Sequence, residues 1–340
     1  MTELLELREK IKLVYAKNEA IILPVVKFLL AFVTLLVINS ELGYMSKINN
    51  IALVLIVALA CSFLPMFFII LFAAAFTMLH MYAMSLEVAL FGAVVYMLMF
   101  LLFFRFSSKD SIVVILVPLL YACKIPYVVP IAVGLLGTPA SAVTVGCGVV
   151  VYYLLAAVTS NATTVNAMND GDAMAKLRLI VDAVLGNKEM LVVVAAFVIT
   201  VIVVYLIRRM SIDYSWTIAM VSGAILNLAI LLVGDLIYDI KISVIGAILG
   251  SILALGIAKV IEFFRFCVDH SRTEKVQFED DEYYYYVKAV PKITVSASTK
   301  TVKRINTPRR PAQRYDVGTG RRSVTISRQD EEDEDYEELL

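Results

Sequence analysis

Apolar segments of about 20 residues fill most of residues 20–264 and constrain the fold more than any other feature. A bilayer core is about 30 Å thick and a helical residue rises about 1.5 Å, so roughly 20 apolar residues cross it. Backbone amides in hydrocarbon need partners inside the protein, and alternating β-barrel patterning is absent. We therefore predict an all-α polytopic membrane protein. About eight transmembrane helices are expected, at residues 20–38, 48–64, 65–83, 86–104, 140–157, 190–207, 214–236 and 242–264.

Charge is segregated along the chain. The sequence is 60% hydrophobic and 18% charged, whereas soluble domains are about 45–50% apolar and about 25% charged. Close to half of the charged side chains lie in residues 268–340. The formal net charge is zero, which favours neither nucleic acid nor an acidic substrate. We expect the lipid bilayer, and no nucleic acid, among the partners.

Two elements depart from the pattern of full spans. Residues 1–18 mix apolar, acidic and basic side chains, which predicts an amphipathic helix at the membrane interface. Residues 110–139 contain several prolines, and Lys124 lies near their midpoint. Proline interrupts a helix, and arms of about 11–14 residues are too short to cross comfortably. We predict a broken or re-entrant helical hairpin at 110–139, with two full spans as the alternative.

Lysine and arginine clusters predict the orientation of the transmembrane domain, residues 19–267. Bases precede the first span and follow the fourth, sixth and eighth, so eight spans place every cluster on one side. The positive-inside rule makes that side cytoplasmic. Both termini are then cytoplasmic, and the connection 160–188 is external. Within this connection, residues 174–185 predict one amphipathic surface helix.

The segment after the last span divides into two regions. Residues 268–298 are rich in aromatic and β-branched side chains, which predicts a short juxtamembrane strand or hairpin. Residues 299–340 are basic and then acidic, with too little apolar surface to offset the entropy of ordering, and are predicted to be a disordered cytoplasmic tail. Its bases are candidates for contact with anionic lipid or a protein partner. They are Lys303, Arg304, Arg309, Arg310, Arg321 and Arg322.

Polar groups at membrane depth are the main functional candidates, because each is costly in hydrocarbon. Lys124 either faces a water-filled cavity or binds an anion. In the alternative interpretation it only lies at the tip of a re-entrant loop. The segment GTPAS (137–141) either exposes backbone groups, as broken transporter helices do, or forms a tight surface turn. Asn227 lies deeper in the seventh span, and its alternative role is only to join helices by hydrogen bonds. Asp235 lies near the end of that span, and its alternative role is in an interfacial acid-base cluster. The candidates for a substrate or ion pathway are Lys124, Gly137, Thr138, Pro139, Ser141, Thr144, Asn227 and Asp235.

Patterns typical of catalysis are missing from the sequence. It contains no GxxxxGK[ST], GxSxG or HExxH motif. Its four cysteines are scattered, and its two histidines lie far apart, so neither offers metal-ligand spacing. We expect no enzymatic activity, no catalytic residue, no metal and no cofactor.

Two segments carry a resemblance to a protein family. They are KIPYVVPIAVGLLGTPASAVTVGCGVVVYY (124–153) and QFEDDEYYYYVKAVPK (277–292). The chain resembles uncharacterised multi-pass membrane proteins of Clostridia-like Gram-positive bacteria, some of which are loosely labelled permeases or ABC transporters. The resemblance implies a bacterial plasma membrane location and assigns no chemistry to individual residues.

Two functional hypotheses follow from the sequence. The first is a permease-like transport component of unknown substrate, which rests on the broken region 110–144. If that component belongs to an ABC system, a separate ATPase must supply the energy. The alternative is a non-enzymatic membrane scaffold or assembly factor, which recruits cytoplasmic partners through the charged tail.

Overall fold

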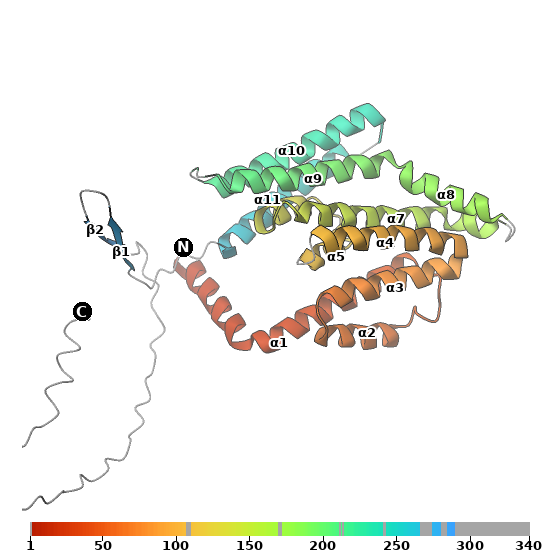
Figure 1. The fold of residues 1–340 in the computed structure, drawn as a ribbon, viewed down its shortest axis with the longest axis horizontal. Helices are drawn as coiled ribbons and strands as arrows, with labels where there is room; N and C mark the ends of the chain where they lie inside the picture. The colour runs from red at the N-terminus through yellow and green to blue at the C-terminus, as the bar shows by residue number, and fades with distance from the viewer. Residues whose placement is uncertain are drawn as a thin grey trace, which may run out of the picture. The chain divides into compact units, whose positions relative to one another are not determined.

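A computed structural model describes residues 2–106, 110–168, 172–210, 212, 214–240, 243–265, 274–279 and 284–289. Within these residues the chain is almost entirely helical (Figure 1). The helices are α1 (Thr2–Glu41), α2 (Ile51–Phe63), α3 (Phe67–Met84), α4 (Leu86–Phe106), α5 (Ser111–Ala122), α6 (Val128–Leu136), α7 (Ser141–Ala167), α8 (Ala173–Leu185), α9 (Lys188–Arg208), α10 (Ser215–Tyr238) and α11 (Val244–Arg265). The strands are β1 (Glu274–Glu279) and β2 (Tyr284–Ala289).

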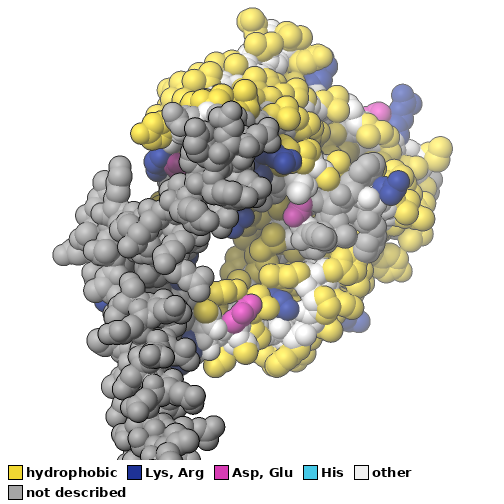
Figure 2. All heavy atoms as spheres, turned by 60° about the vertical axis from the view of Figure 1, so that its left-hand side comes forward, with side chains coloured by type: hydrophobic (Ala, Val, Ile, Leu, Met, Phe, Trp, Pro, Cys, Tyr) yellow, Lys and Arg dark blue, Asp and Glu magenta, His cyan; other side chains and the backbone are white. Residues whose placement is uncertain are grey.

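The chain is a multi-pass integral membrane protein. Among the described residues, six helical segments are long and apolar enough to cross a membrane. They are Lys10–Glu41, Phe67–Met84, Ser141–Ala167, Ala173–Arg208, Ser215–Tyr238 and Val244–Arg265. Hydrophobic side chains also cover much of the described surface, with only scattered charges among them (Figure 2). Lipid is the solvent that suits such a surface.

Helix α1 combines the predicted interfacial helix with the first span. It runs without interruption from Thr2 to Glu41, apart from a kink at Asn18, where φ is −118° and ψ is 21°. The Arg8 guanidinium donates a hydrogen bond of 3.4 Å to the Phe263 carbonyl of α11. Residues 2–18 therefore form one bent helix with the first span, and Arg8 contacts the end of α11.

Helix α2 is too short to cross a bilayer alone, with 13 residues. It pairs with α1 through two side-chain bonds to backbone carbonyls. Lys27 Nζ donates to the Leu64 carbonyl at 3.0 Å, and Ser62 Oγ donates to the Pro24 carbonyl at 2.9 Å. Lys27 thus satisfies a carbonyl at the end of α2, where the helix leaves an acceptor unpaired.

A buried histidine joins α1, α3 and the loop that follows α1. His80 is fully buried, its Nε2 lies 2.9 Å from Asn39 Oδ1, and its Nδ1 accepts the Met45 N–H at 3.1 Å. Because Nδ1 accepts, the ring is a neutral tautomer that donates from Nε2.

In the loop that follows α1, burial raises the pKa of Tyr44, and a side-chain hydrogen bond with Thr159 partly offsets this.

The predicted external connection 160–188 is largely helical. Helix α7 continues to Ala167, and α8 covers Ala173–Leu185, close to the predicted surface helix. Its inner face buries Ile180 and Val184. This segment therefore packs on the bundle.

Helix α7 is the most deeply buried candidate span. In its most apolar stretch 67% of the residues are buried, against 28% in α11. Gly148 allows close packing against α5, because a Cβ there would lie 2.7 Å from Val117 Cβ. Gly134 of α6 does the same against Val204 of α9, also at 2.7 Å. The two short helices α5 and α6 therefore pack closely against α7 and α9, respectively.

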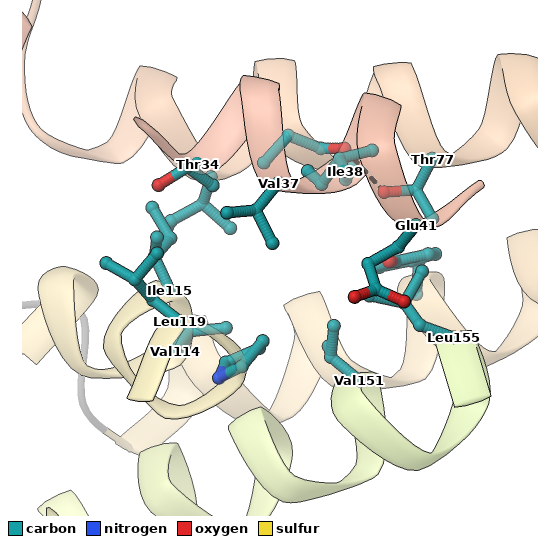
Figure 3. A pocket seen from close by; sticks show the side chains of 15 residues that line it. Thr34, Val37, Ile38, Glu41, Thr77, Val114, Ile115, Leu119, Val151 and Leu155 are labelled. Atoms are coloured by element: carbon teal, nitrogen blue, oxygen red, sulfur yellow. Dashed lines mark hydrogen bonds between the residues drawn. The ribbon is translucent and has the colours of Figure 1, made fainter. Parts of the chain in front are cut away.

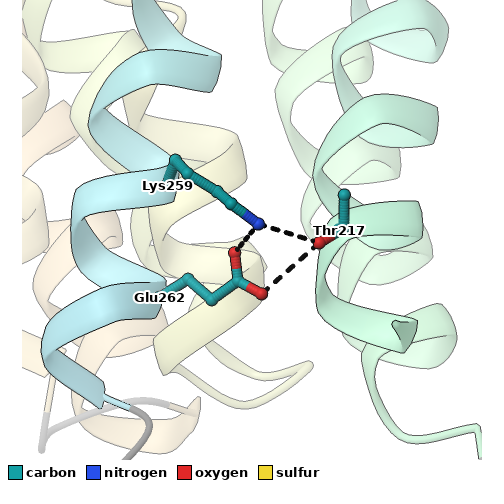
Figure 4. Close-up of polar contacts among 3 residues, drawn as sticks. All are labelled: Thr217, Lys259 and Glu262. Atoms are coloured by element: carbon teal, nitrogen blue, oxygen red, sulfur yellow. Dashed lines mark hydrogen bonds and ion pairs between the residues drawn. The ribbon is translucent and has the colours of Figure 1, made fainter. Parts of the chain in front are cut away.

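Helices α10 and α11 share a polar contact near one end (Figure 4). Lys259 Nζ lies 2.6 Å from Glu262 Oε2 and donates to Thr217 Oγ1 at 3.0 Å. Thr217 Oγ1 in turn donates to Glu262 Oε1 at 3.4 Å. The ammonium, the carboxylate and the hydroxyl in this contact therefore each have a polar partner.

Strands β1 and β2 form an antiparallel pair in the juxtamembrane region 268–298. Their register pairs Glu274 with Ala289 and Glu279 with Tyr284. The predicted disordered tail 299–340, with its candidate bases from Lys303 to Arg322, lies outside the described residues.

Candidate functional site

The candidate site is a helical hairpin made of α5 and α6. Its arms have 12 and 9 residues, each too short to cross a bilayer. Helix α5 ends where the Lys124 N–H bonds the Tyr121 carbonyl and the Ile125 N–H bonds the Leu120 carbonyl, both at 2.9 Å. Pro126 then precedes α6, where its missing N–H costs nothing.

Both arms open at the same end of the bundle. The Ser141 hydroxyl, at the start of α7, donates a hydrogen bond to the carboxylate of Asp110, which precedes α5. Since α6 leads directly into α7, this bond brings the exit of the hairpin to its entrance. Arg208, at the end of α9, donates to the Gly137 carbonyl at 3.3 Å. The two ends of the hairpin therefore lie close together at one end of the bundle.

The tip of the hairpin reaches the middle of α9. Tyr121 and Tyr127, on either side of the turn, each place their ring centroid 6.4 Å from that of Phe197. Phe197 is the tenth of the 21 residues of α9. The turn between the two arms thus lies near half the depth of a spanning helix.

Lys124 sits at this tip in an unusual backbone conformation. Its φ is 62°, in the left-handed region that non-glycine residues rarely adopt. Its side chain is exposed, as are those of Ala122 and Cys123. A charged group is therefore accessible at mid-bundle depth, held in a backbone conformation that costs about 1–2 kcal/mol.

Tyrosines connect the tip with the N-terminal end of α9. Tyr121 stacks on Tyr152 with ring centroids 3.9 Å apart, and Tyr152 lies 5.2 Å from Tyr153. The Tyr153 hydroxyl donates to Glu189 Oε1 at 3.0 Å. We call Tyr121, Tyr152 and Tyr153 the tyrosine cluster. It lies between the exposed Glu189 and the tip.

The structure divides the predicted candidates among several places. Lys124 is at the tip, whereas Gly137, Thr138, Pro139 and Ser141 form the turn at the open end. In that turn the Thr138 N–H bonds Ser141 Oγ at 3.0 Å, and Thr138 and Pro139 are exposed. Asp235 is half-buried near the end of α10. These residues do not form a single site.

Thr144 and Asn227 lie in the interior. Both are fully buried, as is Thr200 of α9. Within the part of the chain that the structure describes, Thr144 Oγ1, Thr200 Oγ1 and both polar atoms of Asn227 have no hydrogen-bond partner. A Cβ at Gly223 would lie 3.6 Å from Thr200 Cγ2, and Asn227 follows one turn later on α10. Asn227 and Thr200 thus lie at similar depth in neighbouring helices.

Sequence reasoning missed Asp110, the tyrosine cluster and Glu189. The signal for the cluster was present, since two adjacent tyrosines interrupt the apolar run of the fifth predicted span. Their hydroxyls in an apolar segment need partners. Asp110 gave no such signal, because it reads as an ordinary residue at a helix start.

A narrow cavity lies beside α5 (Figure 3). It offers about 60 Å³ to the centres of water-sized molecules. It does not reach Lys124 or Gly137. Its lining residues are Thr34, Val37, Ile38, Glu41, Ile70, Ala73, Ala74, Thr77, Tyr96, Val114, Ile115, Pro118, Leu119, Val151 and Leu155.

Metal binding finds no support in the described part of the chain, where no group of three or more His, Cys, Asp or Glu could hold an ion.

The chain matches no family model, no curated protein and no solved structure. Its function is therefore inferred from the hairpin and its surroundings.

Proposed function

We propose that this integral membrane protein is a permease-like transport component. The observation that carries the proposal is the α5–α6 hairpin, whose exposed tip lies level with the middle of α9. Interrupted helices in transporters bring polar groups to the membrane midplane, where substrates bind. A lysine at such depth is costly and usually functional. The hairpin supports transport better than a purely anchoring role.

The substrate that this tip suits is a small anion. Lys124 supplies a positive charge at the turn between two short helices. Its exposed ammonium attracts anions, and low-dielectric surroundings strengthen this attraction. The tyrosine cluster places polar hydroxyls between the tip and Glu189. Glu189 accepts a hydrogen bond from this cluster at the N-terminal end of α9. The charged side chain at the tip itself is Lys124.

The arrangement we propose has eight spans, α1, α2, α3, α4, α7, α9, α10 and α11, with the hairpin between the fourth and the fifth. Helix ends that carry Arg105, Arg208 and Arg265 then share one side, which the positive-inside rule makes cytoplasmic. Both termini are cytoplasmic in this arrangement, and the membrane is a bacterial plasma membrane. Helix α2 crosses only with its flanking residues or where the bilayer thins.

Access to the tip tests the proposal, because Cys123 is exposed next to Lys124, whereas Cys61 and Cys147 are buried. The single-cysteine protein C61A/C147A/C267S is placed in sealed vesicles and treated with a membrane-impermeant maleimide. We expect Cys123 to react from the side opposite Arg208. A matched control carries T138C with C123A and should react only from the Arg208 side. If Cys123 reacts from neither side of the membrane, the proposal is overturned.

Flux measurements test the role of the charge. Proteoliposomes are assayed with a panel of small inorganic and organic anions, using Lys124→Gln and Lys124→Arg. We expect flux of at least one anion, at least tenfold lower in the glutamine variant and partly kept in the arginine variant. Equal flux in Lys124→Gln and the parent would exclude Lys124 from the pathway.

A non-enzymatic scaffold is the second candidate, favoured by the segregated charge of residues 268–340. Its spans would anchor the tail, which recruits cytoplasmic partners. Deleting residues 270–340 separates the two functions. A scaffold loses its function while insertion stays intact, whereas a transport component keeps flux in proteoliposomes.

A further inference from the structure

The cavity beside α5 has a wall that suits hydrocarbon. Its two threonines are satisfied within their own helices, because Thr34 Oγ1 donates to the Leu30 carbonyl and Thr77 Oγ1 to the Ala73 carbonyl, both at 2.7 Å. A cavity of this size holds water only where two to four polar partners are available for each molecule. The wall offers very few, so an apolar occupant is favoured.

One end of the cavity carries a charge. Glu41 is exposed at the end of α1, and its carboxylate points toward the cavity space near Val151 (Figure 3). It is the one ionisable side chain, apart from Tyr96, among the described residues that line this space. The cavity therefore has an apolar body with a single acidic mouth.

A second hollow and an open groove adjoin the cavity on the side of α3 and α4. A second hollow between α3, α4, α5 and α7 shares Ile70, Tyr96, Val114 and Val151 with it. Outside these, an open groove of about 440 Å³ for the centres of water-sized molecules runs along α3 and α4. The groove is lined by Leu71, Ala74, Ala75, Met78, Ala93, Tyr96, Met97, Phe100 and Leu101.

Tyr96 separates the groove from the interior. Both Tyr96 and Ala74 line the groove and the cavity. The Tyr96 side chain is 8% exposed and shares a hydrogen bond with Thr77. On its outer side the groove exposes Met97 and Leu101, at 66% and 59%, as lipid-facing residues do. Only side chains therefore stand between bilayer hydrocarbon and the cavity.

We infer that this cavity binds one alkyl chain of an amine-bearing membrane lipid. The chain enters sideways between α3 and α4 past Tyr96, and its ammonium group lies at Glu41. The apolar wall disfavours sugars and free anions. The bound chain packs against Val114, Ile115 and Leu119 of α5, and so supports one arm of the hairpin. This inference is independent of the transport proposal.

Photo-crosslinking tests the site. The full chain is placed in bilayers that contain a lipid with a diazirine near the end of one acyl chain and an ethanolamine head group, and crosslinks are mapped by mass spectrometry. We expect crosslinks at buried residues of α5 and α7, such as Val114 and Val151, besides those on the lipid-facing surface. Crosslinks confined to exposed residues would overturn the inference.

Two alanines on one turn of α3 provide a matched pair of variants. Ala73 is buried and lines the cavity, whereas Ala75 is exposed and lines only the groove. Ala73→Phe should reduce crosslinking at Val151 at least fivefold, and Ala75→Phe should leave it within twofold of the parent. If Ala73→Phe fails to fold, the smaller Ala73→Leu replaces it. Unchanged crosslinking at Val151 in a folded Ala73 variant would contradict the site.

The head group is tested separately. The ethanolamine probe should label the cavity several-fold more than the same chain on a glycerol head group. Glu41→Gln should abolish this preference, and Glu41→Asp should keep most of it. Equal labelling by both probes in the parent protein would overturn the assignment of the ammonium group to Glu41.

Discussion

Ser141 donates a hydrogen bond to the Asp110 carboxylate, and this bond closes the open end of the α5–α6 hairpin. The two residues lie 31 positions apart, and between them the chain reaches the centre of the bundle and returns. The hairpin therefore depends on a polar contact as well as on packing.

Ser141→Ala should destabilise the protein through this contact. Ser141 is fully buried, and loss of a hydrogen bond to a charged group costs about 1.5–3 kcal/mol. Thermal unfolding in detergent should show a clear fall in Tm. Ser40→Ala, at an exposed serine whose hydroxyl donates to the Val37 carbonyl of its own helix, is the control and should change Tm little. Equal Tm values for both variants would show that the contact contributes nothing.

Lys124→Gly should increase stability while impairing transport. Glycine adopts φ near 62° without the steric cost that lysine bears, about 1 kcal/mol. Lys124→Ala removes the same charge and keeps the cost, so it is the matched control. We expect a higher Tm for glycine than for alanine, and equally low flux for both. A higher Tm for alanine would contradict the strained backbone.

His80→Ala should destabilise the loop that follows α1. The substitution leaves the buried Asn39 Oδ1 and the part-buried Met45 N–H without their partner on the ring, which costs about 1–3 kcal/mol for a buried unsatisfied group. The effect should not add to that of Asn39→Ala, because both remove the same contact. Limited proteolysis within residues 42–50 should become faster. Additive losses of stability in the double variant would exclude the network.

Asn227→Leu should stabilise the protein by about 1 kcal/mol. Both polar atoms of the side chain are buried without a partner among the described residues, and replacing such a group by an apolar one of similar size removes its desolvation cost. Thr200→Val should act in the same direction. Denaturation in mixed micelles measures both. A lower stability for Asn227→Leu would indicate that the amide binds water or substrate, as expected for a pathway residue.

Helix positions could be predicted wherever the sequence marks both ends. Pro65 and Ser85 bracket the predicted span 65–83, and α3 covers Phe67–Met84. Residues 174–185 have a helical apolar period, and α8 covers Ala173–Leu185. Helix α2 is shorter than its predicted span 48–64, because Ile48 belongs to the loop and its carbonyl accepts a bond from Asn39 Nδ2. The count of eight spans stays a prediction.

The hairpin and the cavity differ in how far they could be predicted. Prolines and arm length predicted the interruption at 110–139, because both act on the local backbone. The tyrosine cluster combines side chains from α5 and α7, and its carboxylate partner comes from α9. The cavity combines residues of five helices. Such sites depend on which helices become neighbours, which local pattern does not encode.

The short arms of the hairpin also bear on how the protein is made. Neither α5 nor α6 is long enough to be held in a bilayer by itself. The aromatic rings around the turn rest on Phe197, which the ribosome produces roughly 70 residues later. We therefore expect the hairpin to wait at the membrane surface and to move inward only once α9 has been delivered. Assembly of the central site would then be a late step of biogenesis, and a chain that stops before α9 would leave this segment open to quality-control proteases.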